Sequence, residues 1–396
     1  MADEQKVGEL PSKPPLWTDP KFRAIAFQVI ISAALALFIV YIVRNTLHNM
    51  ELRGIATGFG FLSNEAGFGV LQSLIDYDET YSYGRTFLVG LLNTLLVSAL
   101  GIFFATLLGF IMGVARLSTN WLIARIAATY IEIFRNIPLL LQIFFWYFAV
   151  GINLPHPRQS IALSDVAFLS NRGIYIPRPV QGELFWLTLL AVATAIVAVI
   201  VVAKWARKRQ EQTGQLFHTF YVSLAILIGL PGAVFLITGS PLSWEYPELK
   251  GFNFSGGIAI IPELFSLVLA LTVYTGTFIA ETVRSGIQAV SHGQTEAARA
   301  LGLRESWTLR LIIIPQAMRV IIPPLTSQYL NLTKNSSLAA AVGYPDLVAV
   351  FAGTTLNQTG QAVEIIAMTM AVYLTISLVI SMFMNWYNAK MALRER

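Results

Sequence analysis

The sequence contains no cysteine and only four histidines in 396 residues. The lack of cysteine excludes a disulfide framework, a thiol nucleophile and any zinc or iron–sulfur site built on cysteine ligands. No two of the histidines have the short spacing of a metal-binding pair; they are His48, His156, His218 and His292. These absences argue against a disulfide-rich secreted domain and against a metalloenzyme.

Charge is also scarce. Charged residues make up only 12% of the chain, hydrophobic residues make up 55%, and the mean hydropathy is +0.63. A soluble domain typically carries roughly a quarter charged residues. Because so few charges cannot cover a surface that faces water on all sides, lipid must solvate much of the chain. The net charge of +5 does not require nucleic acid as a partner, since the distribution of basic residues described below explains it.

Long apolar segments dominate what is present. A spanning helix needs about 20 mostly apolar residues. The first such segment, Ala24–Val43, is not a signal peptide, because its apolar core is too long and no cleavage site of small residues follows it. We therefore expect an all-α polytopic membrane protein with about eight transmembrane helices. The eight segments are Ala24–Val43, Thr86–Ala115, Ile126–Val150, Leu184–Ala203, Leu216–Thr238, Pro262–Thr282, Leu309–Leu330 and Val363–Trp386.

Basic residues are concentrated in alternate segments between these spans. If residues 1–23 lie inside, the inner segments hold most of the lysines and arginines, for example Lys204, Arg207, Lys208 and Arg209. Cytoplasmic loops of membrane proteins carry such an excess. The pattern predicts that both termini are cytoplasmic and that the long segments 44–85 and 151–183 are periplasmic.

Two glycine patterns stand out in the sequence. The stretch GFGFLSNEAGFG (Gly58–Gly69) is rich in glycine, but no strand precedes it and no Gly-Lys-Ser/Thr follows it. It therefore predicts an ordered external loop rather than a phosphate loop, and no nucleotide cradle occurs elsewhere in the chain. Gly109 and Gly113 lie four residues apart within one span, which predicts a close helix contact.

A short polar segment follows the sixth span. Ser291 with Gln294 three residues later resembles a capping box, so a helix should begin directly after Ser291. Gly302 is a natural stop in the left-handed conformation. Glu296 lies in the first turns, where a carboxylate suits the helix dipole. Small residues would give this helix a slim surface able to enter a groove on another protein: Ala297, Ala298 and Ala300. The alternative is a solvated connector helix.

This segment resembles the EAA signature of permeases in ATP-binding-cassette (ABC) importers. The matching positions are Glu296, Ala297, Ala298, Gly302, Ile312 and Pro315, with Ile314 as a conservative departure from leucine. The resemblance implies that residues 286–307 form a cytoplasmic coupling loop that docks on an ABC ATPase dimer. It implies that ATP and magnesium belong to that partner, and that no cofactor is bound by this chain. The coupling residues would be Gly293, Glu296, Ala297, Ala298 and Gly302.

Four further segments narrow the resemblance to polar amino-acid permeases of the histidine/glutamine type: Tyr130–Phe148, Thr277–Gln294, Ile314–Leu325 and Leu332–Gly343. Such proteins have a five-helix type I importer core, here expected within residues 86–390. Residues 151–259 would be an inserted periplasmic loop and transmembrane hairpin. This enlargement, with NEAGFG after Ser63, is similar to the general L-amino-acid permeases of Gram-negative bacteria. The resemblance implies an inner-membrane location, L-amino acids as cargo, a second homologous permease subunit and a periplasmic amino-acid-binding protein.

Charges inside spans are candidates for a substrate path. A charge near the bilayer centre costs about 2.5–3.5 kcal/mol on insertion scales, so those retained are functional candidates by default. Glu132, Arg135 and Gln142 would share one helical face, and Pro138 should disturb the helix just past Arg135 and Asn136. Broken helices of this kind bind small zwitterions at membrane depth. A Glu132–Arg135 pair that holds a kink is the structural alternative.

A second polar cluster follows the seventh span, at Lys334, Asn335 and Ser336. These residues either line the same cavity or form a polar interfacial loop. Glu281 and Arg284, at positions i and i+3, favour a structural ion pair near the coupling loop rather than a substrate contact.

Three other functions fit the sequence less well. An ion-coupled secondary amino-acid transporter would show two halves of matching hydropathy, and no convincing internal repeat is present. A membrane-bound enzyme lacks a catalytic triad, a metal cluster or a phosphate loop in this sequence. An ABC permease for a different small solute is disfavoured only by the resemblance.

Overall fold

The computed structural model describes residues 17, 20–52, 54 and 57–391, so most of the predicted N-terminal segment 1–23 lies outside the described residues. Within them, seven helical stretches are long and apolar enough to cross a membrane, and a bent pair of helices supplies an eighth span. The seven are α1 (Pro20–Leu52), α2 (Tyr83–Arg116), α5 (Phe185–Thr213), α6 (Thr219–Ile237), α7 (Pro262–Gln288), the stretch Glu305–Val342 and α12 (Ala362–Met391). Each predicted span has its counterpart, and the predicted all-α membrane fold is confirmed.

The bent pair departs from the prediction of one continuous helix over Ile126–Val150. α3 (Trp121–Asn136) and the helix Leu139–Asn153, which begins as α4 (Leu139–Phe144), meet at an angle of 104°. Ile137 has the extended backbone conformation, as the residue before a proline prefers. Pro138 thus turns the chain sharply instead of merely disturbing the helix.

A body of five spans surrounds the main apolar core, which α2, α4, α7, α10 (Ile314–Asn335) and α12 all line. α2 and α7 approach each other most closely. A Cβ atom at Gly109 would lie 2.5 Å from the Cβ of Ile279, and one at Gly113 would lie 2.6 Å from the carbonyl oxygen of Ala280. The close contact predicted from these two glycines is confirmed.

The chain between α10 and α12 folds back into the body. It contains η7 (Ser336–Val342), η8 (Val348–Thr355) and α11 (Leu356–Thr359). The side-chain amide of Asn93 donates to the Pro345 carbonyl at 2.9 Å, and the Leu347 amide donates to the Thr94 hydroxyl at 3.0 Å. The buried Asp346 carboxylate accepts a bond of 2.8 Å from the Ala349 amide. α2 therefore anchors this returning segment.

The glycine-rich stretch Gly58–Gly69 is an ordered loop, as predicted. Its short helix η2 (Gly60–Ser63) buries Phe61, whose ring stacks on Phe351 with centroids 6.2 Å apart. The backbone amide of Gly58 donates to the buried Glu364 carboxylate. The loop therefore packs over the returning segment.

The inserted region contains β structure that the sequence did not predict. The strands are β1 (Ile161–Ser164), β2 (Ala167–Ser170), β3 (Gly173–Ile176), β4 (Arg178–Gln181), β5 (Leu242–Glu245), β6 (Glu248–Lys250), β7 (Asn253–Ser255) and β8 (Ile258–Ile260). One sheet has the order β1-β2-β3-β8, while β4 pairs with β5 and β6 with β7, all antiparallel. Strands before the α5–α6 hairpin thus pair with strands after it.

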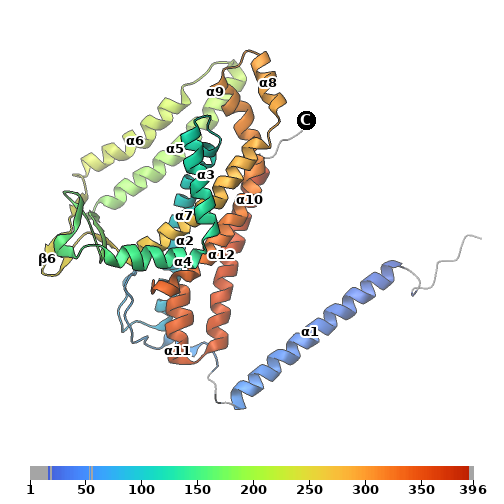
Figure 1. Cartoon of the computed structure of the whole chain (residues 1–396), viewed down its shortest axis with the longest axis vertical. Helices are drawn as coiled ribbons and strands as arrows, with labels where there is room; N and C mark the ends of the chain where they lie inside the picture. The colour runs from blue at the N-terminus through green and yellow to red at the C-terminus, as the bar shows by residue number, and fades with distance from the viewer. Residues whose placement is uncertain (1–16, 18–19, 53, 55–56, 392–396) are drawn as a thin grey trace, which may run out of the picture.

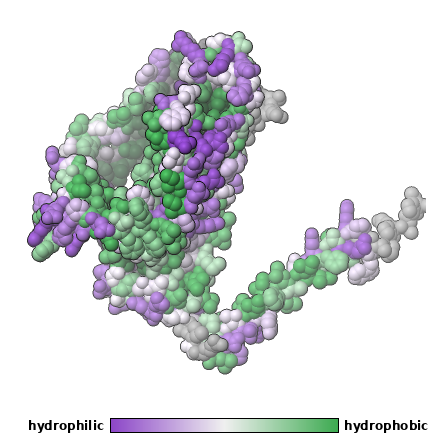
Figure 2. Space-filling view, viewed as in Figure 1, coloured by the Kyte–Doolittle hydropathy of each residue, from purple (hydrophilic) through white to green (hydrophobic). Residues whose placement is uncertain are grey.

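Two parts stand away from the five-span body in Figure 1. α5 and α6 pack against each other and rise from the β strands toward the end of the molecule that carries α8 and α9. α1 lies apart from the rest of the chain, and no part of its most apolar stretch is buried. Figure 2 shows apolar side chains over much of the surface and a hydrophilic band down one face of the body.

Candidate functional site

The short polar helix predicted after Ser291 is α8 (His292–Ala300). The Ser291 hydroxyl accepts a 3.3 Å bond from the Gly293 amide, one residue earlier than a full capping box requires, while Gln294 instead accepts a bond from Gln316. At the other end Gly302 has φ +71°, and the Leu303 amide donates to the Ala298 carbonyl at 3.1 Å. This is the left-handed stop expected of a Schellman motif.

The slim surface predicted for α8 is only partly as expected, because Ala297 and Ala300 are exposed but Ala298 faces the body. Gly293, Glu296, Ala297 and Gly302 are exposed, whereas Ala298 is buried. The helix is thus held to the body on one side and is open on the other. Figure 1 shows it at one extreme of the molecule, beyond the ends of α7 and α10.

Two apolar side chains beside α8 were not singled out from the sequence. Leu301 is 79% exposed and Trp307, in α9 (Glu305–Thr308), is 52% exposed. An ion pair of 3.1 Å between Arg299 and Glu305 links α8 to α9. Exposed apolar side chains around a polar helix are typical of a protein contact. Residue type alone does not show which apolar side chains stay exposed, so neither one gave a signal.

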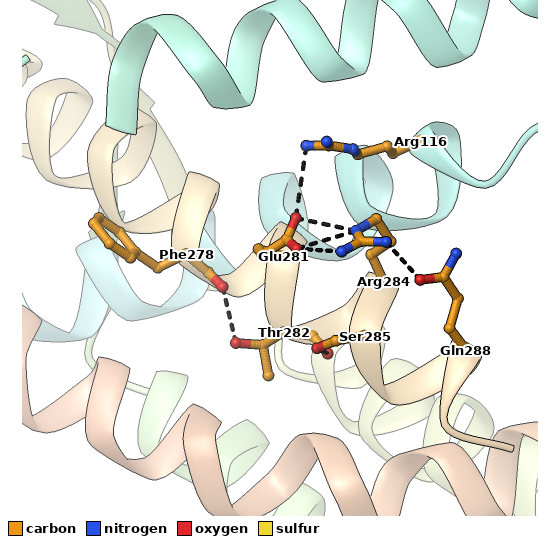
Figure 3. A network of polar contacts seen from close by, with 7 residues as sticks. All are labelled: Arg116, Phe278, Glu281, Thr282, Arg284, Ser285 and Gln288. Carbon is orange, nitrogen blue, oxygen red and sulfur yellow. Dashed lines mark hydrogen bonds and ion pairs between the residues drawn. The ribbon is translucent and has the colours of Figure 1, made fainter. Parts of the chain in front are cut away.

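A polar network lies near the α8 end of α7 (Figure 3). The Arg284 Nε donates to both carboxylate oxygens of Glu281 at 3.1 Å, and an Arg284 Nη donates to Gln288. Arg116, the last residue of α2, adds a 3.6 Å ion pair to the same carboxylate. The predicted Glu281–Arg284 ion pair is confirmed. Arg116 was missed, because its partner lies on a helix far away in the sequence.

Arg135 is exposed at the end of α3, and its guanidinium lies 5.2 Å from the centroid of the Phe278 ring. Phe278 is one helical turn before Glu281 on α7, so the ends of α2 and α3 converge on one stretch of α7. Glu132 and Asn136 are also exposed. Among the described residues no ion pair joins Glu132 to Arg135; the Asn136 side chain donates to the Glu132 carbonyl at 2.8 Å instead.

Gln142 does not share a face with Glu132 and Arg135, because the 104° bend separates α3 from α4. The single helical face expected from the sequence is therefore wrong. Gln142 is 3% exposed, and its Nε2 donates to the carbonyls of Phe134 and Ile137 at 2.8 and 2.9 Å. It thereby satisfies backbone acceptors that the break leaves without a helical partner.

The second cluster, like the first, contains both exposed and buried residues. Lys334 is exposed in the last turn of α10, and Asn335 is half-buried. Ser336 is fully buried at the start of η7, and its hydroxyl donates to the Thr333 carbonyl at 2.8 Å. α4 and η7 are in contact, so the two predicted clusters lie on adjacent segments of the body.

The sequence matches the model of a known protein family. Residues 105–393 match the model of the binding-protein-dependent transport system inner membrane component. The chain belongs to this family. The permease is thus a multi-pass inner-membrane transport component rather than an enzyme, and its family implies an ATPase and a substrate-binding protein as partners.

Relatives match the permease over almost its whole length. It is 57% identical to the putative amino-acid ABC transporter permease protein YhdX of Escherichia coli, over 96% of this chain and 97% of the relative. It is 52% identical to the general L-amino acid transport system permease protein AapQ of Rhizobium johnstonii, over 96% and 94%. A solved chain of an amino acid ABC transporter with histidines covers 78% of this chain and 95% of its own, at 21% identity and a TM-score of 0.46.

No group of three or more metal-ligating side chains is placed to hold an ion in the part of the permease that the structure describes. The polar side chains of the body instead form charge pairs and hydrogen bonds. The candidate functional features are therefore the exposed helix α8 and the polar side chains of α3, α7 and α10.

Proposed function

We propose that the permease moves L-amino acids across the inner membrane as one half of a pathway completed by a second homologous permease subunit. The main support is the near full-length identity to relatives named as amino-acid permeases. A periplasmic amino-acid-binding protein would deliver the substrate. An ABC ATPase dimer, which holds ATP and magnesium, would dock on the exposed Gly293, Glu296, Ala297 and Gly302, while the buried Ala298 would hold α8 against the body.

Exposed charges at membrane depth support the two-subunit pathway. Arg135, Glu132 and Lys334 lie on spans yet are exposed in the single chain, and such residues normally face a bundle interior or a water-filled cavity. We propose that a second permease subunit packs against the body and encloses these three side chains. The buried Gln142 and Ser336 would then hold the segments that line the pathway, and the more exposed Asn136 and Asn335 would lie at its edge.

A substrate amino acid is a zwitterion, and the exposed cations suit its carboxylate. We assign that contact to Arg135, because a guanidinium offers two parallel N–H donors to a carboxylate. Phe278 would hold the guanidinium plane through its ring. Glu132, three residues earlier on α3, is placed to attract the substrate ammonium group.

Substitution of Arg135 by lysine tests this assignment. The change keeps the positive charge and removes the two-pronged geometry, so we expect amino-acid uptake into proteoliposomes to fall about tenfold or more. Assembly with the ATPase should be unchanged. The matched control is Arg125→Lys, an exposed arginine nearly three turns earlier on α3, which should transport normally. Failure of the Arg135 variant to assemble would show that the residue is structural.

We further propose that α8 and both termini are cytoplasmic and that the β strands are periplasmic, as the distribution of basic residues indicates. Because the chain has no cysteine, single cysteines can be placed cleanly. Ser164 in β1 and Ala300 in α8 are both exposed. In spheroplasts an impermeant maleimide should label Ser164→Cys and leave Ala300→Cys unlabelled. The reverse pattern would contradict the proposed orientation.

A further inference from the structure

The end of the α5–α6 hairpin forms a compact basic knob, residues 204–218. The charge-free part of α5, Phe185–Ala203, is matched in length by the 19 residues of α6. α5 then continues to Thr213 with Lys204, Arg207, Lys208, Arg209 and Glu211, and the chain turns at Gly214, where φ is +69°.

The chain after Gly214 folds back along this extension. Arg209 donates to the Gln215 side chain at 2.8 Å and lies 5.4 Å from the ring centroid of Trp205. The Phe217 ring meets the Trp205 ring edge to face, with centroids 5.2 Å apart. These contacts fix the shape of the knob without using Lys204 or Lys208.

The position of the knob matches the headgroup layer of a bilayer. At 1.5 Å per helical residue, Arg207 to Arg209 lie roughly 5–8 Å beyond Lys204, the first residue after the apolar run. The polar layer on each side of the hydrocarbon core is about 5–7 Å thick. Exposed aromatic rings mark the same level; they are Trp205, Phe220 and Tyr221. Such rings prefer the membrane interface.

The rest of the described chain leaves most of this hairpin uncovered, and its apolar surface suits lipid. α5 and α6 pack mainly against each other, and large apolar side chains remain exposed along both helices up to the knob, including Val197, Val201 and Ile228. Figure 1 shows the knob at the same end of the molecule as α8. A bilayer that surrounds the apolar part of the hairpin would place these cations at its headgroup layer.

Two of these cations form no ion pair within the described residues. Arg207 pairs with Glu211 at 3.2 Å, and Arg209 is held by Gln215. Within the residues that the structure describes, Lys204 and Lys208 have no ion-pair partner, and both are exposed. They lie at positions i and i+4, where side chains on a helix are neighbours. Both ammonium groups can therefore reach one phosphate.

We propose that Lys204 and Lys208 bind the phosphate of an anionic phospholipid in the leaflet on the α8 side, and that this contact anchors the hairpin. Lysine binds phosphate as a point charge, and basic clusters directly beside a spanning helix are attracted to anionic lipid. The paired rings of Trp205 and Phe217 would lie beside the first carbons of the acyl chains.

The test uses the intact transporter with its ATPase, purified in detergent and titrated with phosphatidylglycerol while native mass spectrometry counts bound lipid. Neutralising one basic side chain near an anionic surface weakens binding about fivefold. The Lys204→Gln/Lys208→Gln variant should therefore bind phosphatidylglycerol roughly 25-fold more weakly. The charge-preserving control Lys204→Arg/Lys208→Arg, and Arg125→Gln on α3, should both bind as the wild type does.

Three results would overturn the proposal. The double glutamine variant could bind phosphatidylglycerol as tightly as the wild type. The wild type could bind zwitterionic phosphatidylcholine, or inorganic phosphate alone, equally well. Lastly, the double glutamine variant could lose its ATPase subunit while lipid binding is unchanged, which would make the knob a protein contact.

Discussion

Replacement of Gly302 by valine is expected to abolish substrate-stimulated ATP hydrolysis and uptake while the permease still inserts in the membrane. Gly302 has φ +71°, and nothing lies within 4 Å of an added Cβ atom. The penalty is therefore backbone strain alone, on the order of 1–2 kcal/mol for a left-handed residue with a side chain. That strain falls at the end of α8, so the docking surface should distort before the spans do.

Glu296→Lys should uncouple the complex by a different route. Glu296 is exposed on α8, and its replacement puts a positive charge on the proposed docking face without backbone strain. We expect co-purification of the ATPase with the permease to fall for both variants. ATPase activity in proteoliposomes should fall with it.

Gly214→Val is the matched control for Gly302→Val. Gly214 has φ +69°, and a Cβ atom there would also meet nothing within 4 Å, so the same strain is introduced at another helix end on the same side of the molecule. Coupling should survive. If Gly302→Val and Glu296→Lys keep wild-type coupling, or if Gly214→Val loses it equally, α8 is only a connector.

Gly109→Val is expected to prevent the permease from reaching a folded state. Its Cβ atom would lie 2.5 Å from that of Ile279, and the carbonyl oxygen of Gly276 is 3.0 Å away. α2 and α7 would have to separate, although both line the main core. Overpacking costs about 1–3 kcal/mol even where neighbours can shift, and here one neighbour is backbone. Gly113→Val should act likewise, since its Cβ atom would meet the Ala280 carbonyl oxygen at 2.6 Å.

The measurement is the amount of monodisperse permease extracted from the membrane, followed by its thermal stability in detergent. Gly229→Val on α6 is the matched control, because an added Cβ atom there has nothing within 4 Å. It should be recovered at wild-type levels. Equal recovery and stability of Gly109→Val and Gly229→Val would show that α2 and α7 can separate at little cost.

The sequence predicted those features that depend on short-range pattern. Runs of apolar residues identified every span, because bilayer thickness demands about 20 of them regardless of how they pack. Ser291 and Gly302 marked the two ends of α8, because helix termini need caps whatever surrounds them. The Gly109–Gly113 pair indicated a close helix contact, although not that α7 was the partner.

Features that depend on particular side-chain contacts, and not on a repeating pattern, were beyond reach. The size of the turn at Pro138 depends on Gln142, whose amide reaches back to Phe134 and Ile137. Arg116 joins Glu281 only because α2 and α7 pack side by side. The strands of the insertion are three or four residues long, too short for an alternating pattern to stand out.

The strand pairs that join the two ends of the inserted region, residues 151–259, constrain the order in which the chain folds as it enters the membrane. β3 leaves the site of synthesis long before its partner β8, and the register Tyr175–Ala259 can form only after α5 has crossed the bilayer and α6 has returned. β4 waits likewise for β5, through the register Arg178–Glu245. Closing so long a loop before the hairpin exists would cost chain entropy with no compensating contact. The sheet is therefore completed late. It can be completed only in a chain whose α5 and α6 have both been inserted.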